Sequence, residues 1–123
     1  MAVTLPRILV VDDYEVNRDL YREYLTFCGF EVIEARNGGE AIEKALAHKP
    51  DLIVMDLGLP LLDGWSATRI LKSDHRTRHV PIVVVTGFTQ ERHEQAAREA
   101  GADAFLPKPC LEELVKEVGK LLR

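Results

Sequence analysis

The sequence has few cysteines, and this limits both its chemistry and its cellular compartment. Only Cys28 and Cys110 occur among 123 residues, and neither belongs to a CxxC pair. Two such residues cannot form the disulfide framework of a small secreted protein, so a reducing cytoplasm fits best. We expect both cysteines to be ordinary packing residues.

Long hydrophobic runs and an excess of positive charge are also missing. No apolar run approaches the roughly 20 residues that span a bilayer, and residues 1–7 do not resemble an export signal. The 16 basic residues are outnumbered by 20 acidic ones, which gives no basic surface for nucleic acid. We therefore expect neither membrane insertion nor direct nucleic-acid binding. With 46% hydrophobic and 29% charged residues, the chain is predicted to be one soluble globular domain.

Four short apolar runs, by contrast, end in groups that can bind phosphate or a metal. Residues 8–11 precede Asp12 and Asp13, residues 52–55 precede Asp56, residues 82–85 precede Thr86, and residues 104–106 lead to Lys108. Ligands of parallel sheets bind at the carboxyl ends of the strands. Three carboxylates, a hydroxyl and an ammonium can therefore converge after folding, which indicates a Mg²⁺-dependent phosphoryl site.

Helical patterns alternate with these runs and with a fifth strand at residues 31–35. The first helix is predicted over residues 15–27, with Val16, Leu20, Tyr24 and Phe27 on one apolar face. Further helices are expected around residues 41–46, at 65–72, from an N-cap at Thr89 to residue 100, and at 111–122. This alternation predicts a doubly wound α/β domain, in which helices cover both faces of a five-stranded parallel sheet.

The ordered set of motifs resembles a response regulator receiver domain of two-component phosphorelay signalling, similar to stand-alone chemotaxis-type regulators. It comprises Asp12-Asp13, Asp56, Thr86 and Lys108-Pro109, together with Leu59-Pro60 and Asp63-Gly64 in the loop after Asp56. The resemblance covers nearly the whole chain and implies a flavodoxin-like fold with strand order 2-1-3-4-5. We expect a single receiver domain over residues 1–123, with an ordered core at about residues 7–122 and no output domain.

The resemblance also implies the role of each site residue. Asp56 accepts a phosphoryl group from a phosphohistidine of a sensor kinase or histidine phosphotransfer protein. Asp13 and Asp56 bind Mg²⁺ directly, Asp12 binds it directly or through water, and the backbone carbonyl of Gly58 completes the set, with Mn²⁺ as a possible substitute. Lys108 neutralises phosphoryl charge. The chain is then no turnover enzyme, but a phosphoacceptor that assists its own phosphorylation and dephosphorylation.

The implied switch involves Thr86 and Phe105. The Thr86 hydroxyl bonds a phosphoryl oxygen and draws its loop inward, while Phe105 swings toward the vacated space, and Pro109 permits a cis Lys108–Pro109 bond. The output surface is then the fourth helix, fifth strand and fifth helix, which regulate a partner protein or a missing output domain, and phosphorylation can drive dimerisation. The residues Tyr14, Glu15 and Val16 are candidates for contact with the phosphodonor, although Val16 is equally consistent with a core position.

Gly58 and Phe88 differ from the residues that many relatives carry at these positions. Neither can position an attacking water, so they are predicted to tune the lifetime of the phosphorylated state and to make it long. His48, His75, His79 and His93 do not group as a metal site and are expected on the solvated surface.

Two other functions remain open. A receiver-like module that works without phosphorylation would be expected to lack one of the site groups, and none is missing here. A Mg²⁺-dependent aspartyl-phosphate phosphatase of the haloacid dehalogenase type needs a second aspartate two residues after the nucleophile, where this chain has Gly58.

Overall fold

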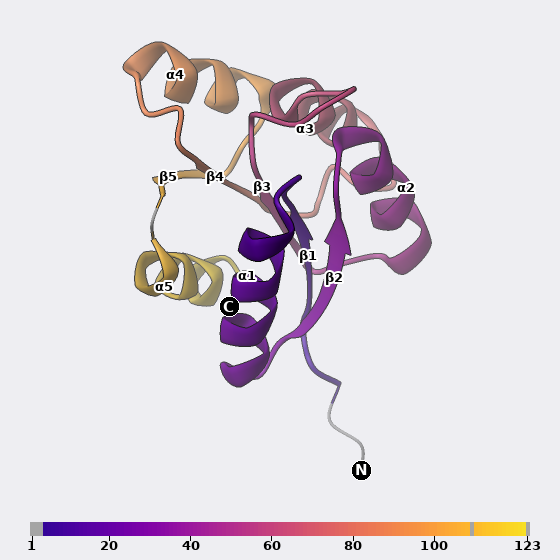
Figure 1. The fold of residues 1–123 in the computed structure, drawn as a ribbon. Coiled ribbons are helices and arrows are strands. Elements are labelled where there is room, and N and C mark those ends of the chain that lie inside the picture. Colours follow the sequence, from indigo (N-terminus) through magenta and orange to yellow (C-terminus); the bar gives the residue numbers. More distant parts are fainter. Residues whose placement is uncertain (1–3, 109, 123) are drawn as a thin grey trace.

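Strands and helices alternate along the whole described chain, which comprises residues 4–108 and 110–122 of a computed structural model (Figure 1). The elements are β1 (Arg7–Val11), α1 (Glu15–Phe27), β2 (Glu31–Ala35), α2 (Gly38–His48), β3 (Leu52–Met55), α3 (Gly64–Ser73), β4 (Ile82–Thr86), α4 (Glu91–Ala100), β5 (Ala104–Pro107) and α5 (Leu111–Leu121). Each agrees with the sequence-based prediction to within a few residues at its ends.

The strands form one parallel sheet in the order β2-β1-β3-β4-β5. In the register of the sheet, Val11 lies beside Met55 and Met55 beside Val84, so β1, β3 and β4 finish at the same edge. The central strands β3 and β4 are buried along their entire length, which explains their unbroken runs of Leu, Ile and Val. The predicted doubly wound, flavodoxin-like fold is therefore confirmed.

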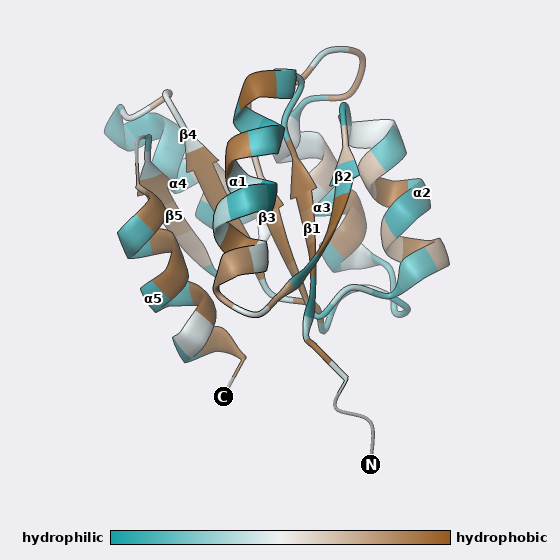
Figure 2. Cartoon of the chain, turned by 60° about the horizontal axis from the view of Figure 1, so that its bottom comes forward, coloured by the Kyte–Doolittle hydropathy of each residue, from teal (hydrophilic) through white to brown (hydrophobic). Residues whose placement is uncertain are grey.

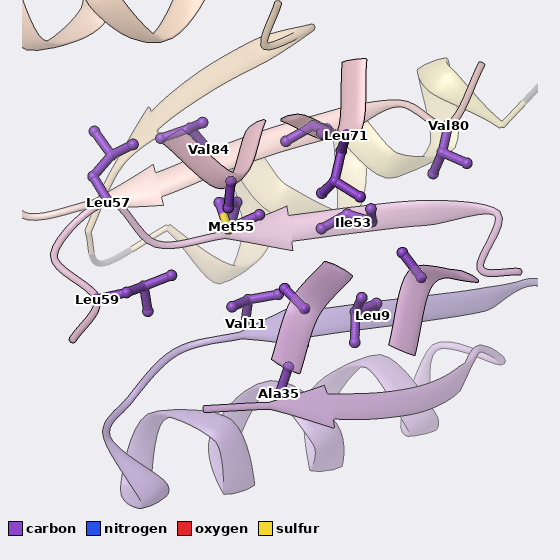
Figure 3. Close-up of a cluster of buried hydrophobic side chains, with 14 of the residues drawn as sticks. Leu9, Val11, Ala35, Ile53, Met55, Leu57, Leu59, Leu71, Val80 and Val84 are labelled. Atoms are coloured by element: carbon purple, nitrogen blue, oxygen red, sulfur yellow. The ribbon is translucent and has the colours of Figure 1, made fainter. Parts of the chain in front are cut away.

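Alternate residues of each strand point to opposite faces and form two separate cores. Leu9, Ile53 and Val84 pack beneath α2, α3 and α4, together with helix residues such as Leu71 (Figure 3). Ile8, Val10, Val54 and Val85 face α1 and α5, against residues such as Leu25 and Leu114. The central strands β1, β3 and β4 are accordingly brown along most of their length in Figure 2, whereas β2 is partly teal and α4 is mostly teal.

Helix α1 uses a different face from the one predicted. Its buried residues are Arg18, Tyr21 and Leu25, whereas Val16, Leu20 and Phe27 are 59%, 49% and 89% exposed. The buried arginine explains the error, because its guanidinium donates to the Asp12 carbonyl at 2.9 Å and pairs with Glu34 at 3.3 Å. A charged residue thus occupies the core side of the helix, while three large apolar residues face outward. The alternative prediction, that Val16 lies in the core, is therefore wrong.

The helices differ in whether a side chain caps their N-terminus. The side chains of Asn37 and Asp63 accept backbone N–H groups at the starts of α2 and α3, at 2.8 Å in both cases. Helix α4 begins one residue later than predicted, with Gln90 rather than Thr89 at the N-cap, and Gln90 makes no side-chain cap bond.

Two other sequence-based expectations need correction or limitation. Cys110 is buried as expected, but Cys28 is exposed after the end of α1 and is no packing residue. Pro109 lies outside the described residues, so the geometry of the Lys108–Pro109 bond is not defined. No helix in the described ranges is both long and apolar enough to cross a membrane.

Candidate phosphoryl-transfer site

Three carboxylates meet at the carboxyl edge of the sheet. Asp12 and Asp13 follow β1, Asp56 follows β3, and each contributes an oxygen that lies within 4.8 Å of the other two. Asp12 and Asp56 are only 2% and 9% exposed, whereas Asp13 is exposed. The site is therefore an acidic cluster with two buried members and one exposed member.

Lys108 completes the group from the far side of the sheet. Its ammonium donates to Asp12 Oδ2 at 2.8 Å and to Asp56 Oδ2 at 3.0 Å. Burial of Lys108 lowers its pKa, but the hydrogen bonds and negative charges of Asp12 and Asp56 outweigh this effect and raise the pKa above its usual value. Lys108 thus remains a cation at neutral pH.

The donor set suits a small divalent cation. Three carboxylates and one ammonium leave two formal negative charges, and all three acids offer the oxygen ligands that Mg²⁺ prefers. The Gly58 N–H points back to Asp56 Oδ1 at 3.4 Å, so the loop that carries the fourth expected ligand folds beside the acids. The residues present therefore fit the expected metal.

The first turn of α1 holds Asp12 in place through contacts that the sequence-based reasoning missed. The Tyr14 N–H donates to Asp12 Oδ1 at 2.9 Å, and Asn17 Nδ2 donates to Asp12 Oδ2 at 3.2 Å. Arg18 fixes the carbonyl of the same residue, as described above. The position of the helix in the sequence could have indicated these contacts. A helix that begins directly after Asp12 and Asp13 directs its first turn toward the site.

The loop after Asp56 depends on Gly64. A side chain at this position would strike the Asp56 carbonyl and lie 2.7 Å from Leu57 Cα, and the Gly64 N–H donates to the Leu57 carbonyl at 3.0 Å. The Asp63-Gly64 element thus has a structural basis: Asp63 caps α3, and Gly64 lets α3 start against the backbone of the site.

Thr86 and Phe105 occupy the positions from which the expected switch would start. Thr86 is fully buried at the end of β4, and its Oγ1 accepts the Phe88 N–H at 3.1 Å. Phe105 in β5 is half-buried and packs against the core cluster beneath α2, α3 and α4. The described residues include no hydrogen bond between Thr86 and Asp56.

Phe88 and His93 form part of an aromatic cluster with Trp65. Phe88 is 44% exposed, and a Cβ added at Gly58 would lie 2.8 Å from its ring. The His93 ring contacts Trp65 at a tilt of 43° and has a buried Nδ1 atom without a partner among the described residues, so its expected place on the solvated surface is wrong. His48, His75 and His79 are exposed as expected.

Comparisons with known proteins agree with this architecture. Residues 8–119 match the response regulator receiver domain family. The polar-differentiation response regulator DivK of Brucella anthropi is 40% identical over 102 residues, which are 83% of each chain. The chemotaxis protein CheY4 of Vibrio cholerae is 28% identical, with a TM-score of 0.90 over 97% of this chain and 100% of that one.

A further solved structure contains the expected metal. The receiver domain of the sensor histidine kinase PA1611 of Pseudomonas aeruginosa has a magnesium ion in its active site cleft. It is 31% identical to this chain, with a TM-score of 0.89 over 97% of this chain and 98% of that one. On the family match and the identity to DivK, the chain belongs to the response regulator receiver domain family.

Proposed function

We propose that Asp56 accepts a phosphoryl group from the phosphohistidine of a sensor kinase or histidine phosphotransfer protein, in a reaction that depends on Mg²⁺. The observation that carries this proposal is the position of the Asp56 carboxylate, which lies 3.0 Å from the Lys108 ammonium and within 4.8 Å of the Asp12 and Asp13 oxygens. Such an arrangement combines a nucleophile with the charges that phosphoryl transfer requires.

The transfer forms one bond and breaks one. An Asp56 carboxylate oxygen forms a bond to phosphorus, the bond between phosphorus and the histidine nitrogen breaks, and the nitrogen keeps its electron pair. Lys108 then shares its hydrogen bonds with the equatorial phosphoryl oxygens, on which charge accumulates in the transition state. The same groups assist dephosphorylation, in which a water oxygen forms a bond to phosphorus, the bond from phosphorus to the Asp56 oxygen breaks, and inorganic phosphate and the free Asp56 carboxylate result.

Asp13, Asp56, Asp12 and the Gly58 carbonyl are the proposed metal ligands. Bound Mg²⁺ supplies charge neutralisation and orients the phosphoryl oxygens. Mn²⁺ is a proposed substitute because it accepts the same oxygen ligands. Asn17 and Arg18 keep Asp12 oriented, and Lys108 provides the remaining positive charge.

Phosphorylation is proposed to shift the population between two states of the β4–α4 loop. The Thr86 hydroxyl now accepts the Phe88 N–H, and rotation toward phosphorylated Asp56 exchanges this bond for one to a phosphoryl oxygen. Phe105 follows into the space that Thr86 leaves, and the surface of α4, β5 and α5 changes for a downstream protein, with dimerisation as one possible consequence.

The exposed face of α1 is the proposed contact surface for the phosphodonor. Tyr14, Val16 and Leu20 are 58%, 59% and 49% exposed, close to the site. A hollow of about 130 Å³ next to them is lined by residues that include Leu20, Lys108 and Leu111. Apolar side chains that are about half exposed to solvent suit a surface that a partner covers.

Intact mass after incubation with acetyl phosphate tests the proposal. Wild type should gain about 80 Da only when Mg²⁺ is present, because the anhydride forms on Asp56. Asp56→Asn should gain nothing, whereas Asp19→Asn, a change at a half-exposed acid of α1, should behave as wild type. A wild type that gains no mass under either condition would favour the phosphorylation-independent module.

The loop after Asp56 argues against the phosphatase alternative. Gly58 stands where such an enzyme needs its second aspartate, and the Phe88 ring lies over it. A cytoplasmic location remains a prediction.

A further inference from the structure

The structure suggests how the state of the site reaches α4. We propose that Trp65, Phe88 and His93 form an aromatic latch that fastens the first half of α4 to α3, and that the latch opens when Asp56 is phosphorylated. The opening step rests on the proposed function, whereas the fastening step does not.

The three rings contact one another in pairs. Their centroids are 5.9 Å apart for Trp65 and Phe88, 5.8 Å for Trp65 and His93, and 5.3 Å for Phe88 and His93. These separations and the tilted or edge-on orientations lie in the range of favourable aromatic pairs. Each ring comes from a different segment: Trp65 from α3, Phe88 from the β4–α4 loop and His93 from α4. The cluster therefore joins all three.

Helix α4 has little else to hold its first half. Its only buried residues are Ala97 and Ala100, both in the second half, and no side chain caps its N-terminus. Glu91, Arg92 and Gln95 are exposed. Trp65 Nε1 donates to the His93 carbonyl at 3.3 Å, which adds a polar bond between the neighbouring helices α3 and α4 (Figure 1). The attachment of residues 91–95 thus depends largely on the latch.

Phe88 connects the latch to the site in two ways. Its N–H donates to the Thr86 hydroxyl at 3.1 Å, and its ring lies against Gly58, two residues after Asp56. When Thr86 turns toward a phosphoryl oxygen, the Phe88 N–H loses its acceptor. The loop then has to rearrange to satisfy that group, and the ring can no longer keep its place between Gly58, Trp65 and His93.

The test uses the full chain with beryllofluoride, which mimics the phosphoryl group, and Mg²⁺. Binding is followed by fluorine NMR, and the latch by amide hydrogen exchange of residues 91–95. Because Trp65 is the only tryptophan, its emission gives a second readout. We expect beryllofluoride to accelerate exchange in residues 91–95 by roughly 2- to 10-fold and to change the Trp65 emission.

Two variants separate fastening from opening. His93→Ala should exchange rapidly in residues 91–95 even without beryllofluoride, whereas Leu61→Ala, a change at a 95% exposed residue, should match wild type. Slow exchange in His93→Ala would refute the fastening. Bound beryllofluoride with unchanged exchange and emission in wild type would refute the opening alone. A failure of beryllofluoride to bind would contradict the proposed function and the opening together, while the fastening would still be judged by His93→Ala.

Discussion

The Lys108 ammonium lies 2.8 Å from Asp12 Oδ2, although β5 and β1 are separated in the sheet by β3 and β4. The side chain therefore spans the carboxyl edge of the sheet and also reaches Asp56 at 3.0 Å. It contacts two of the three acids of the cluster, so a bound cation would have to share these carboxylates with it. This relationship predicts opposite effects of Lys108 on metal binding and on phosphorylation.

Lys108→Met should bind Mg²⁺ more tightly but phosphorylate more slowly. Removal of the ammonium raises the negative charge around the metal, and we expect the Kd for Mg²⁺ to fall by roughly 5- to 10-fold. The phosphorylation rate should fall because the charge on the phosphoryl oxygens loses its partner. Calorimetry and the acetyl phosphate assay measure the two effects, with Lys116→Met as the control at an exposed lysine. Parallel loss of both properties would instead indicate damage to the fold.

The stability of the protein should fall between pH 10 and pH 12, in part because of Tyr21. Burial raises the pKa of this phenol from 10.0 to about 12, with the nearby Lys108 opposing the shift. The unfolded chain therefore loses the proton first, so the stabilisation is complete below pH 10 and disappears as the pH rises through the folded pKa. At pH 11 the loss amounts to about 1.4 kcal/mol.

Tyr21→Phe isolates this contribution. Urea unfolding at pH 8 and pH 11 should show a smaller decrease in the free energy of unfolding for the variant than for wild type. Other groups that titrate in this range contribute to both proteins and cancel in the comparison. An equal decrease in both proteins would contradict the structure, in which the Tyr21 side chain is shielded from water.

Leu25→Ala and Leu20→Ala should differ sharply in stability, although both change a leucine of α1. Leu25 is completely buried, so its truncation should cost about 2–5 kcal/mol. Leu20 is 49% exposed and should cost less than about 1 kcal/mol. Urea unfolding provides the comparison, and similar losses would mean that α1 is rotated relative to the structure.

The same helix shows where sequence-based prediction reaches its limit. The strands followed from uniform apolar runs, since β3 and β4 are buried on both faces and carry a simple signal, whereas their order was implied by the resemblance to receiver domains. Helix α1 carries two competing apolar patterns, and the choice between them depends on Arg18, whose burial requires Glu34 and the Asp12 carbonyl. Glu34 lies in β2 and Asp12 directly follows β1, so the sequence of α1 alone could not identify these partners.

The sequence predicted the acidic residues of the candidate site, but not the side chains that contact and orient them. Asp12, Asp13, Asp56 and Lys108 each follow a strand, and parallel strands bring such ends together. The bond from Asn17 to Asp12 and the contact of Phe88 with Gly58 depend on side-chain directions in loops and first helical turns. Hydrophobic periodicity carries no information about such directions.

Gly64→Ala should destabilise the protein, whereas Gly119→Ala should stabilise it. A methyl group at Gly64 meets the backbone of Asp56 and Leu57, which cannot move without disturbing β3, and we expect a loss of about 2–4 kcal/mol. Gly119 lies inside α5 with open space around its Cβ position, so alanine should add about 0.5–1 kcal/mol. Thermal and urea unfolding would decide, and a tolerated Gly64→Ala would contradict the close approach of α3 to the site.

The phosphorylated state should be long-lived because Gly58 and Phe88 offer no group that can hold an attacking water. We expect loss of the added 80 Da to be about 10-fold faster in a Gly58→Asn and Phe88→Glu double variant, whose side chains can bind and polarise that water.

Gly58→Asn alone has to displace the Phe88 ring, since even its Cβ would lie 2.8 Å from that ring. Because Phe88 is half-exposed, the ring can move aside, and the single variant should remain folded. Phe88→Leu serves as the apolar control and should keep the slow decay. Decay in wild type as rapid as in the double variant would show that these two positions do not set the lifetime.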